Sequence, residues 1–218
     1  MCGRFTLNIP PEVIAKVFGL QDIPQYEPRY NIAPSLAVAT VRHIEDRNKL
    51  DFMKWGLIPS WSKEIVRSPV NSRSETVHEK LMFAQALKYN RCIIPASGFY
   101  EWQSHGDHKQ PYYVRLSNSS VMGFAGLWER WKTEDGSDLE TCCILTTDAN
   151  EIMKPIHDRM PVVLQSDSYN LWLNCNMHDP HELERLYQPF PPDQMVAFPV
   201  PDLVNNTRFD GPACIVQV

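Results

Sequence analysis

The sequence lacks the signals that define several common classes of protein. No apolar run approaches the ~18 residues of a membrane span, and the first residues do not form the basic-then-apolar pattern of a secretory signal. It also has no Gly-x-Ser-x-Gly elbow, glycine-rich phosphate loop or metal-ligand spacing. We therefore expect no membrane partner, no metal site and no cofactor.

Cysteine is present, but not in the pairs that zinc sites or disulfide frameworks use. The six cysteines are spread along the chain without a C-x-x-C spacing. Cys92, Cys142 and Cys214 lie in apolar, strand-like runs, where a buried free thiol is the usual state. This pattern predicts a reduced, cytoplasmic protein.

Charge is unevenly distributed along the chain. The net charge of −5 argues against wholesale binding of nucleic acid. Residues 1–133 nevertheless contain 17 Lys and Arg against 12 Asp and Glu, whereas residues 134–218 contain 4 against 14. An anionic partner is thus expected to meet a surface built from the first 133 residues, unless the acidic residues only solvate C-terminal helices.

The 218 residues predict one α+β domain, 1–218, with a mainly antiparallel sheet that curls into a barrel-like shape. Eighteen prolines exclude long helices, and 22–35 resembles a long loop. The apolar patterns predict strands at 3–8, 36–42, 50–58, 91–95, 98–103, 111–117, 121–130, 139–147, 195–200 and 213–217. They predict short helices at 11–18, 76–88, 148–156, 167–174 and 180–187.

Two of these helices have specific boundary signals. Pro10 and Pro11 open the first helix, Gly19 ends it, and Val13, Ile14, Val17 and Phe18 form its apolar stripe. Thr76 and Glu79 have the spacing of a capping box, which predicts that the second helix begins near residue 76.

Cys2 has the most informative position in the chain. It follows Met1 directly, and its small side chain permits removal of that methionine. The new terminus would carry an α-amine and a thiol on one residue. The amine can condense with an aldehyde and the thiol can then close a thiazolidine ring, so Cys2 is a candidate covalent nucleophile. A disordered terminal tail is the alternative interpretation.

Arg4 and the segment 71–75 supply groups that suit an anionic ligand. Arg4 follows Gly3 and offers a fork-shaped donor for phosphate. Asn71 and Arg73 precede a predicted helix, and anions bind well at helix N-termini. A plain polar loop with a helix cap explains the same residue types.

Glu101 lies in an aromatic, strand-like run at 98–102. Strand alternation places it on one face with Phe99, and it places Tyr100 and Trp102 on the other. A carboxyl group beside aromatic rings is desolvated, which favours its protonated form and suits it to proton transfer. An exposed glutamate on a half-solvated strand is the alternative.

His157 is followed directly by an acid, Asp158, and a base, Arg159. An apolar strand at 162–164 comes shortly after them. This setting suits a proton shuttle, and it equally suits a core histidine with its hydrogen bonds satisfied.

Eight short motifs occur in an order typical of one family. The chain resembles the SOS-response-associated peptidase (SRAP) family, abasic-site-processing proteins that crosslink to DNA. The motifs are Met-Cys-Gly-Arg-Phe at 1–5, Tyr-Asn-Ile-Ala-Pro at 30–34, Trp-Gly-Leu-Ile-Pro-Ser-Trp at 55–61, Asn-Ser-Arg-Ser-Glu-Thr at 71–76, Arg-Cys-Ile-Ile-Pro-Ala at 91–96, Gly-Phe-Tyr-Glu-Trp at 98–102, Ile-His-Asp-Arg-Met-Pro at 156–161 and Leu-Val-Asn-Asn at 203–206.

The resemblance implies a covalent reaction with abasic sites in single-stranded DNA, whose open sugar presents an aldehyde at C1′. After autoproteolytic loss of Met1, Cys2 would form a thiazolidine crosslink with that carbon. Asn71 would position the α-amine and the sugar, and Glu101 would handle protons. His157 would act as an acid or base near the sugar and favour strand scission, an AP-lyase activity, or crosslink reversal.

The resemblance also implies a DNA path and a working context. Five side chains would contact DNA: Arg4 and Arg73 at phosphates, and Trp61, Trp102 and Met82 along the bases. Some relatives have a second aromatic residue where this chain has Ser62, so a wedge beside the lesion is expected to be weaker here. We expect a monomer without a cofactor, cytoplasmic and associated with the nucleoid when bound to DNA.

Two other functions remain compatible with the residues. Cys2 and His157 could form an N-terminal-nucleophile cysteine peptidase that needs no DNA. The basic half and its tryptophans could instead bind single strands without covalent chemistry, which would make binding salt-sensitive and independent of Cys2.

Overall fold

A computed structural model describes residues 2–65 and 68–218, and this part of the chain is α+β. Five strands close a small mixed barrel in the order β10-β4-β3-β6-β9, with β9 returning to β10. Only β4 and β10 pair in parallel within this ring. The ring strands are β3 (Ala37–Ile44), β4 (Arg47–Trp55), β6 (Arg91–Ala96), β9 (Met122–Lys132) and β10 (Asp138–Asp148).

Three short strands extend the barrel at its edges. β5 (Asn71–Arg73) continues the parallel pairing on β10 beyond the end of β4. β11 (Arg159–Pro161) pairs with the last residues of β10, and β12 (Val163–Leu164) pairs with the start of β9. The segments 71–73 and 159–161 thus lie on either side of one strand.

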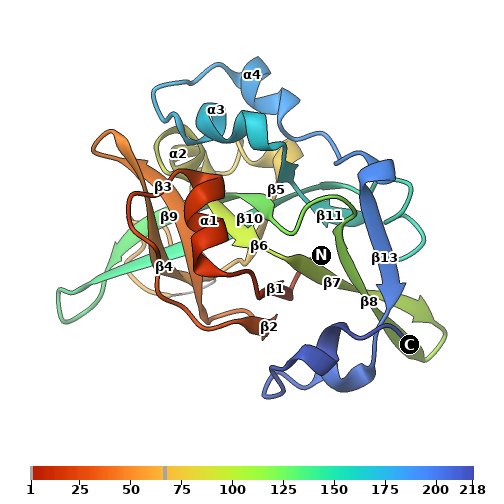
Figure 1. Cartoon of the computed structure of the whole chain (residues 1–218). Helices are drawn as coiled ribbons and strands as arrows, with labels where there is room; N and C mark the ends of the chain where they lie inside the picture. Colours follow the sequence, from red (N-terminus) through yellow and green to blue (C-terminus); the bar gives the residue numbers. More distant parts are fainter. Residues whose placement is uncertain (1, 66–67) are drawn as a thin grey trace.

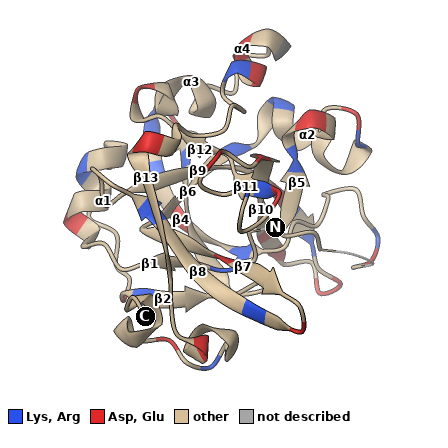
Figure 2. Ribbon diagram, turned by 90° about the vertical axis from the view of Figure 1, so that its right-hand side faces the viewer, with Lys and Arg blue, Asp and Glu red and all other residues tan. Residues whose placement is uncertain are grey.

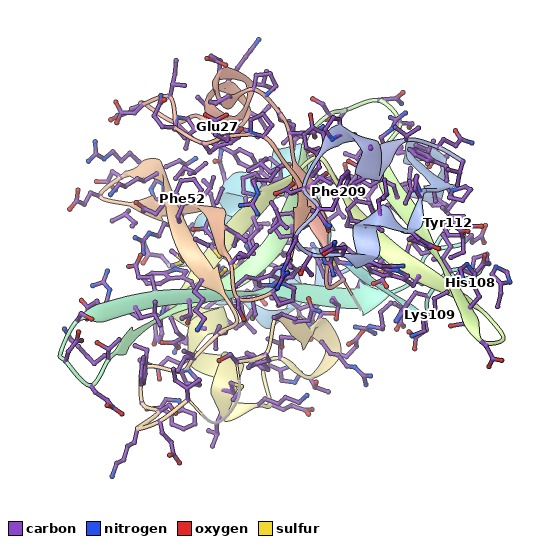
Figure 3. All side chains as sticks on the ribbon, turned by 90° about the horizontal axis from the view of Figure 1, so that it is seen from below. Glu27, Phe52, His108, Lys109, Tyr112 and Phe209 are labelled. Carbon is purple, nitrogen blue, oxygen red and sulfur yellow. The ribbon has the colours of Figure 1, made fainter. Side chains whose placement is uncertain are left out.

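A five-stranded antiparallel sheet packs beside the barrel (Figure 1). Its order is β13-β8-β7-β1-β2, and Ser97 alone separates β6 of the barrel from β7. The hairpin of β7 and β8 projects from the body, with His108, Lys109 and Tyr112 along its second strand (Figure 3). The strands are β1 (Phe5–Leu7), β2 (Arg29–Ile32), β7 (Gly98–His105), β8 (His108–Leu116) and β13 (Met195–Pro199).

The helices are short, as the prolines predicted. They are α1 (Pro11–Phe18), α2 (Leu81–Tyr89), α3 (Tyr169–Leu173) and α4 (Pro180–Arg185). Gly19 ends α1 in the left-handed conformation with φ of 62°. Single turns of 3-10 helix occur at Ser74–Thr76, Ser166–Ser168, Pro192–Gln194, Asp202–Asn205 and Pro212–Ile215. Within the described residues, no helix is long and apolar enough to cross a membrane.

The predicted fold class is confirmed, and so are the strands near 37–55, 91–148 and 195–199. Several local predictions were wrong. The second helix begins at Leu81, because Thr76 ends a 3-10 turn and no side chain caps the helix at Lys80. In place of the expected helix at 148–156, Asp148 ends β10 and 151–156 form turns, and the expected strand at 213–217 is replaced by a 3-10 turn.

Two further predictions need correction. The expected loop at 22–35 contains β2, which pairs with β1. On α1, Ile14, Ala15 and Phe18 form the buried face, whereas Val13 and Val17 are exposed. Ile14 and Phe18 of the predicted stripe are confirmed, whereas Val13 and Val17 were wrong and Ala15 was missed, because the sequence alone does not show which side of a short apolar helix is buried.

The main core fills the barrel and the space between the two sheets. Phe5 of β1 meets Trp55 and Phe124 of the barrel edge-to-face, with ring centroids 5.1 and 6.0 Å apart. Cys92, Cys142 and Cys143 are fully buried free thiols in this core. The first strand of the chain is therefore anchored by its side chains in the centre of the molecule.

The Gly98→Ala variant tests the contact between β7 and β8. A Cβ at Gly98 would lie 2.5 Å from the Tyr113 hydroxyl oxygen and 2.6 Å from the Val114 carbonyl oxygen. We expect a loss of about 1–3 kcal/mol in the free energy of unfolding, typical of overpacking. Urea unfolding measures it. Gly211→Ala is the control, because its nearest neighbour would be 3.9 Å away; equal losses in both variants would contradict this account.

Candidate functional site

Cys2 lies inside the protein, with none of its surface exposed. It precedes β1, and its carbonyl oxygen accepts a hydrogen bond of 2.8 Å from Nδ2 of Asn71. Asn71 is the first residue of β5, opposite Ile144 of β10. Oδ1 of Asn71 is buried and has no hydrogen-bond partner within the part of the chain that the structure describes. An acceptor is therefore available beside the N-terminal residue.

Glu101 lies on β7, opposite Tyr112 of β8, and is 2% exposed. Phe99 packs in the main core, whereas Tyr100 and Trp102 belong to a second, smaller core, so the predicted alternation is confirmed. Burial raises the pKa of the Glu101 carboxyl, and the nearby His157 offsets part of that rise. Burial likewise raises the pKa of the Cys2 thiol, and the charge of Glu101 adds to the effect. Both shifts favour the neutral form relative to the same group in water.

His157 follows the turns at 151–156 and precedes β11. Gln103, two residues after Glu101 on β7, donates a hydrogen bond of 2.9 Å to the Pro155 carbonyl and ties these turns to the strand. Nδ1 of His157 accepts a 3.0 Å hydrogen bond from the Arg159 amide and lies 2.8 Å from Oδ1 of Asp158. The neutral ring with its proton on Nε2 suits the amide, and the imidazolium suits the carboxylate.

Arg159 connects the two segments that contribute Asn71 and His157. Its guanidinium donates to both carboxyl oxygens of Glu75 at 2.7 and 2.9 Å, and also to Asp148 and to the Thr146 carbonyl. Although burial alone would raise it, the hydrogen bonds and charge of Arg159 hold the pKa of Glu75 below its ordinary value. The sequence did not indicate that Arg159 and Glu75 form a pair, because no local pattern relates residues 84 positions apart.

Arg4 binds the C-terminal part of the chain. Its Nη1 donates to Oδ1 of Asn31 and to the Val204 carbonyl, both at 2.7 Å, and its guanidinium lies over the Trp102 ring at 5.8 Å. Asn31, fully buried, donates to the carbonyls of Val204, Asn206 and Phe209. We call this set of contacts the C-terminal clamp, and Phe209 is labelled in it in Figure 3.

The remaining residues that were predicted to contact DNA differ in accessibility. Trp102 is half-buried, and its Nε1 donates to Oδ1 of Asn205 at 2.7 Å, within the C-terminal clamp. Arg73 is exposed on β5, and Trp61 is exposed in the loop after β4. Met82 is half-buried against the main core. The structure thus brings Cys2, Asn71, Glu101 and His157 together, with Arg4 anchored beside them.

Charges of both signs surround this site. Figure 2 shows acidic and basic residues interspersed around β5, β10 and β11. Among residues 2–65 and 68–218, no group of three or more His, Cys, Asp or Glu is placed to hold a metal ion. The chemistry available here is that of a buried thiol, a carboxyl group, an amide and an imidazole.

Comparison with known proteins identifies the family. The sequence pattern of the SOS response associated peptidase (SRAP) family matches residues 1–207. The chain belongs to this family. It is 42% identical to the abasic site processing protein YoqW of Bacillus subtilis, with 99% of each chain covered. It is 29% identical to the abasic site processing protein HMCES of Xenopus tropicalis, over all of this chain and 78% of that one.

The SRAP fold is also found in solved structures. A crystal structure of a Bacteroides thetaiotaomicron protein superposes over the full length of both chains with a TM-score of 0.90 at 24% identity. A Bordetella bronchiseptica protein covers 92% of this SRAP chain with a TM-score of 0.81 at 25% identity. The barrel and its companion sheet are therefore shared with these proteins.

Glu101→Gln tests the electrostatic environment of the site. A folded-state pKa above the ordinary value means that the unfolded chain ionises first, so the carboxyl destabilises the fold as pH rises above about 4.3. We expect the variant to melt at a higher temperature than wild type near pH 7 and at the same temperature near pH 4. Calorimetry at both pH values measures the difference.

Glu129→Gln is the matched control for this measurement. Glu129 is 3% exposed on β9, and burial raises the pKa of its carboxyl as well. Both variants should therefore show the same pH-dependent gain. A lower melting temperature for Glu101→Gln at pH 7, with Glu129→Gln raised, would contradict the assignment of a desolvated, destabilising carboxyl at position 101.

Proposed function

We propose that this protein processes abasic sites in single-stranded DNA by covalent capture through Cys2. The observation that supports it best is the convergence of Cys2, Asn71, Glu101 and His157 from four separate segments. The names of YoqW and HMCES, abasic site processing proteins, agree with it. Removal of Met1 by the protein itself is part of the proposal, because capture needs the free α-amine of Cys2.

The proposed reaction uses each group once. The α-amine adds to C1′ of the open sugar, and loss of one water gives an imine. Sγ of Cys2 then adds to the same carbon, and Glu101 relays the thiol proton to the imine nitrogen, which becomes the ring N–H of a thiazolidine. A neutral thiol needs such a base, because the thiolate is the nucleophile. The unpartnered Oδ1 of Asn71 can accept a hydrogen bond from the α-amine and orient it.

His157 serves as the second acid–base group in this proposal. Its charge lowers the pKa of Glu101, so the two groups influence one another electrostatically. The Arg159 amide and the Asp158 carboxylate both contact Nδ1 and hold the ring in place. Crosslink reversal and strand scission, an AP-lyase activity, are assigned to this residue.

The peptidase alternative is less well supported by the electrostatics. A cysteine peptidase works with a thiolate whose pKa an adjacent imidazolium has lowered. Here burial and the neighbouring Glu101 raise the pKa of Cys2. A carbonyl that is first converted to an imine by the α-amine is a better electrophile for such a thiol than a peptide bond.

The decisive experiment uses an oligonucleotide with one uracil, with and without uracil-DNA glycosylase. We expect a heat-stable shifted band on a denaturing gel only with the glycosylase. Cys2→Ala should abolish the band, and Cys2→Ser should give at most a reversible imine, because an oxygen nucleophile forms no stable thiazolidine. Mass spectrometry confirms that residue 2 is the N-terminus; a stable band from either variant would exclude the mechanism.

Glu101→Gln and Glu129→Gln separate chemistry from stability in the same assay. Both variants remove a buried carboxylate, but only Glu101 lies beside Cys2. We expect Glu101→Gln to slow formation of the band by roughly 10²–10⁴-fold, the usual contribution of a general acid or base. Glu129→Gln should react at the wild-type rate, and equal slowing in both would refute a role for Glu101 in proton transfer.

A further inference from the structure

A groove outside the candidate site runs along the outer face of α2. It has a volume of about 690 Å³ and is lined by Trp61, Leu81, Ala84, Gln85, Lys88 and Tyr89. Trp61 is 61% exposed, Leu81 83% and Tyr89 47%. Large apolar side chains that gather on one exposed surface mark an interaction site more often than chance exposure does. The residues of this α2 groove are thus suited to a partner that covers rings and aliphatic groups.

The chemistry of the α2 groove indicates what this partner is. The Lys88 ammonium lies 5.0 Å from the centroid of the Tyr89 ring, and Gln85 adds an amide that can donate and accept. The six lining residues include no carboxylate. Rings that can stack on bases, combined with a cation that can meet the backbone, are the usual features of single-strand binding surfaces.

A neighbouring groove provides a contrast on the same molecule. It is lined by Lys63, Glu64, Ile65, Trp131, Thr133, Glu134 and Asp135, and so it holds three carboxyl groups beside an aromatic ring. A phosphodiester strand is repelled there, whereas the α2 groove presents only positive charge. Charge complementarity thus selects the α2 groove for an anionic polymer.

The α2 groove is also close to the candidate site along the chain. Asn71, which binds the Cys2 carbonyl, is ten residues from Leu81 at the start of α2. Ten extended residues span ~36 Å at most, so one oligonucleotide can reach both places. The strand that enters the site can therefore continue across α2.

We propose that the α2 groove binds unpaired bases of the strand that carries the abasic site, several nucleotides away from the lesion. Trp61 and Tyr89 stack on bases, Leu81 contacts their edges and sugars, and Lys88 meets a phosphate. This proposal rests on the proposed function. Its new content is a second contact region that sets how much single strand on one side of the lesion the protein needs.

The test compares three oligonucleotides, each with one abasic site. One has about 15 nucleotides on both sides, and the others are cut close to the lesion on the 5′ or the 3′ side. On the long strand, Tyr89→Ala should raise the half-saturating DNA concentration for crosslinking by about fivefold or more without changing the maximal rate. On one of the short strands, wild type and variant should become equal.

Two conservative variants sharpen the result. Tyr89→Phe keeps the ring and should behave as wild type. Lys88→Gln should reduce the slope of log affinity against log salt by about 0.7, the value for one phosphate on a single strand. The controls are Phe52→Ala on β4, whose ring is 48% exposed, and Lys109→Gln on the β7–β8 hairpin, both labelled in Figure 3. Neither should change the half-saturating concentration or the salt slope.

The outcomes separate this proposal from the proposed function. If wild type crosslinks the long strand and Tyr89→Ala has the same half-saturating concentration, the α2 groove does not bind the strand and the proposal is overturned. If wild type crosslinks nothing, the proposed function fails, and fluorescence anisotropy with an undamaged oligonucleotide decides about the groove. In that anisotropy measurement, weaker binding by Tyr89→Ala than by wild type supports the proposal for the α2 groove, and equal binding overturns the proposal.

Discussion

The burial of the first residues between the two sheets is the constraint on which the rest of the site depends. Chain termini usually fray, yet Cys2 has no exposed surface and is followed within three residues by Phe5 in the centre of the core. Asn71 binds Cys2 from the barrel side, and the C-terminal clamp holds Arg4 from the other. The entropic cost of fixing residue 2 therefore arises during folding and not during a reaction. A nucleophile that is already positioned reacts faster for this reason.

The same burial creates the electrostatic character of the site. Removing water from Cys2 and Glu101 disfavours both anions, so each ionises more readily beside a partner with positive charge. A protonated imine at C1′ is such a partner, because it stabilises the thiolate that attacks it. The environment that makes Cys2 a poor nucleophile toward a neutral carbonyl thus fits a reaction in which its own amine first generates the electrophile.

Local patterns predicted what depends on near neighbours in the sequence. The alternation around Glu101 and the left-handed end of α1 at Gly19 follow from the side chains themselves. The convergence of the site could not be obtained this way, because the parallel pairing of β5 on β10 and the bond between Arg159 and Glu75 join distant segments. Arg4 shows the same limit: its fork-shaped donor was evident, but Asn31, 27 residues away, determines where it is anchored.

A protein with a net charge of −5 can still present a surface that a phosphate backbone tolerates. Near the site, Arg159 pairs with both Glu75 and Asp148, and burial raises the pKa of Glu101. On the barrel, Arg42 and Arg130 share Glu140, and Arg42 also binds Asp51. Each of these paired carboxylates has an arginine beside it, whereas Arg73 and Lys88 lie on accessible surface. The net charge of the whole chain therefore does not describe the local charge along β5 and α2.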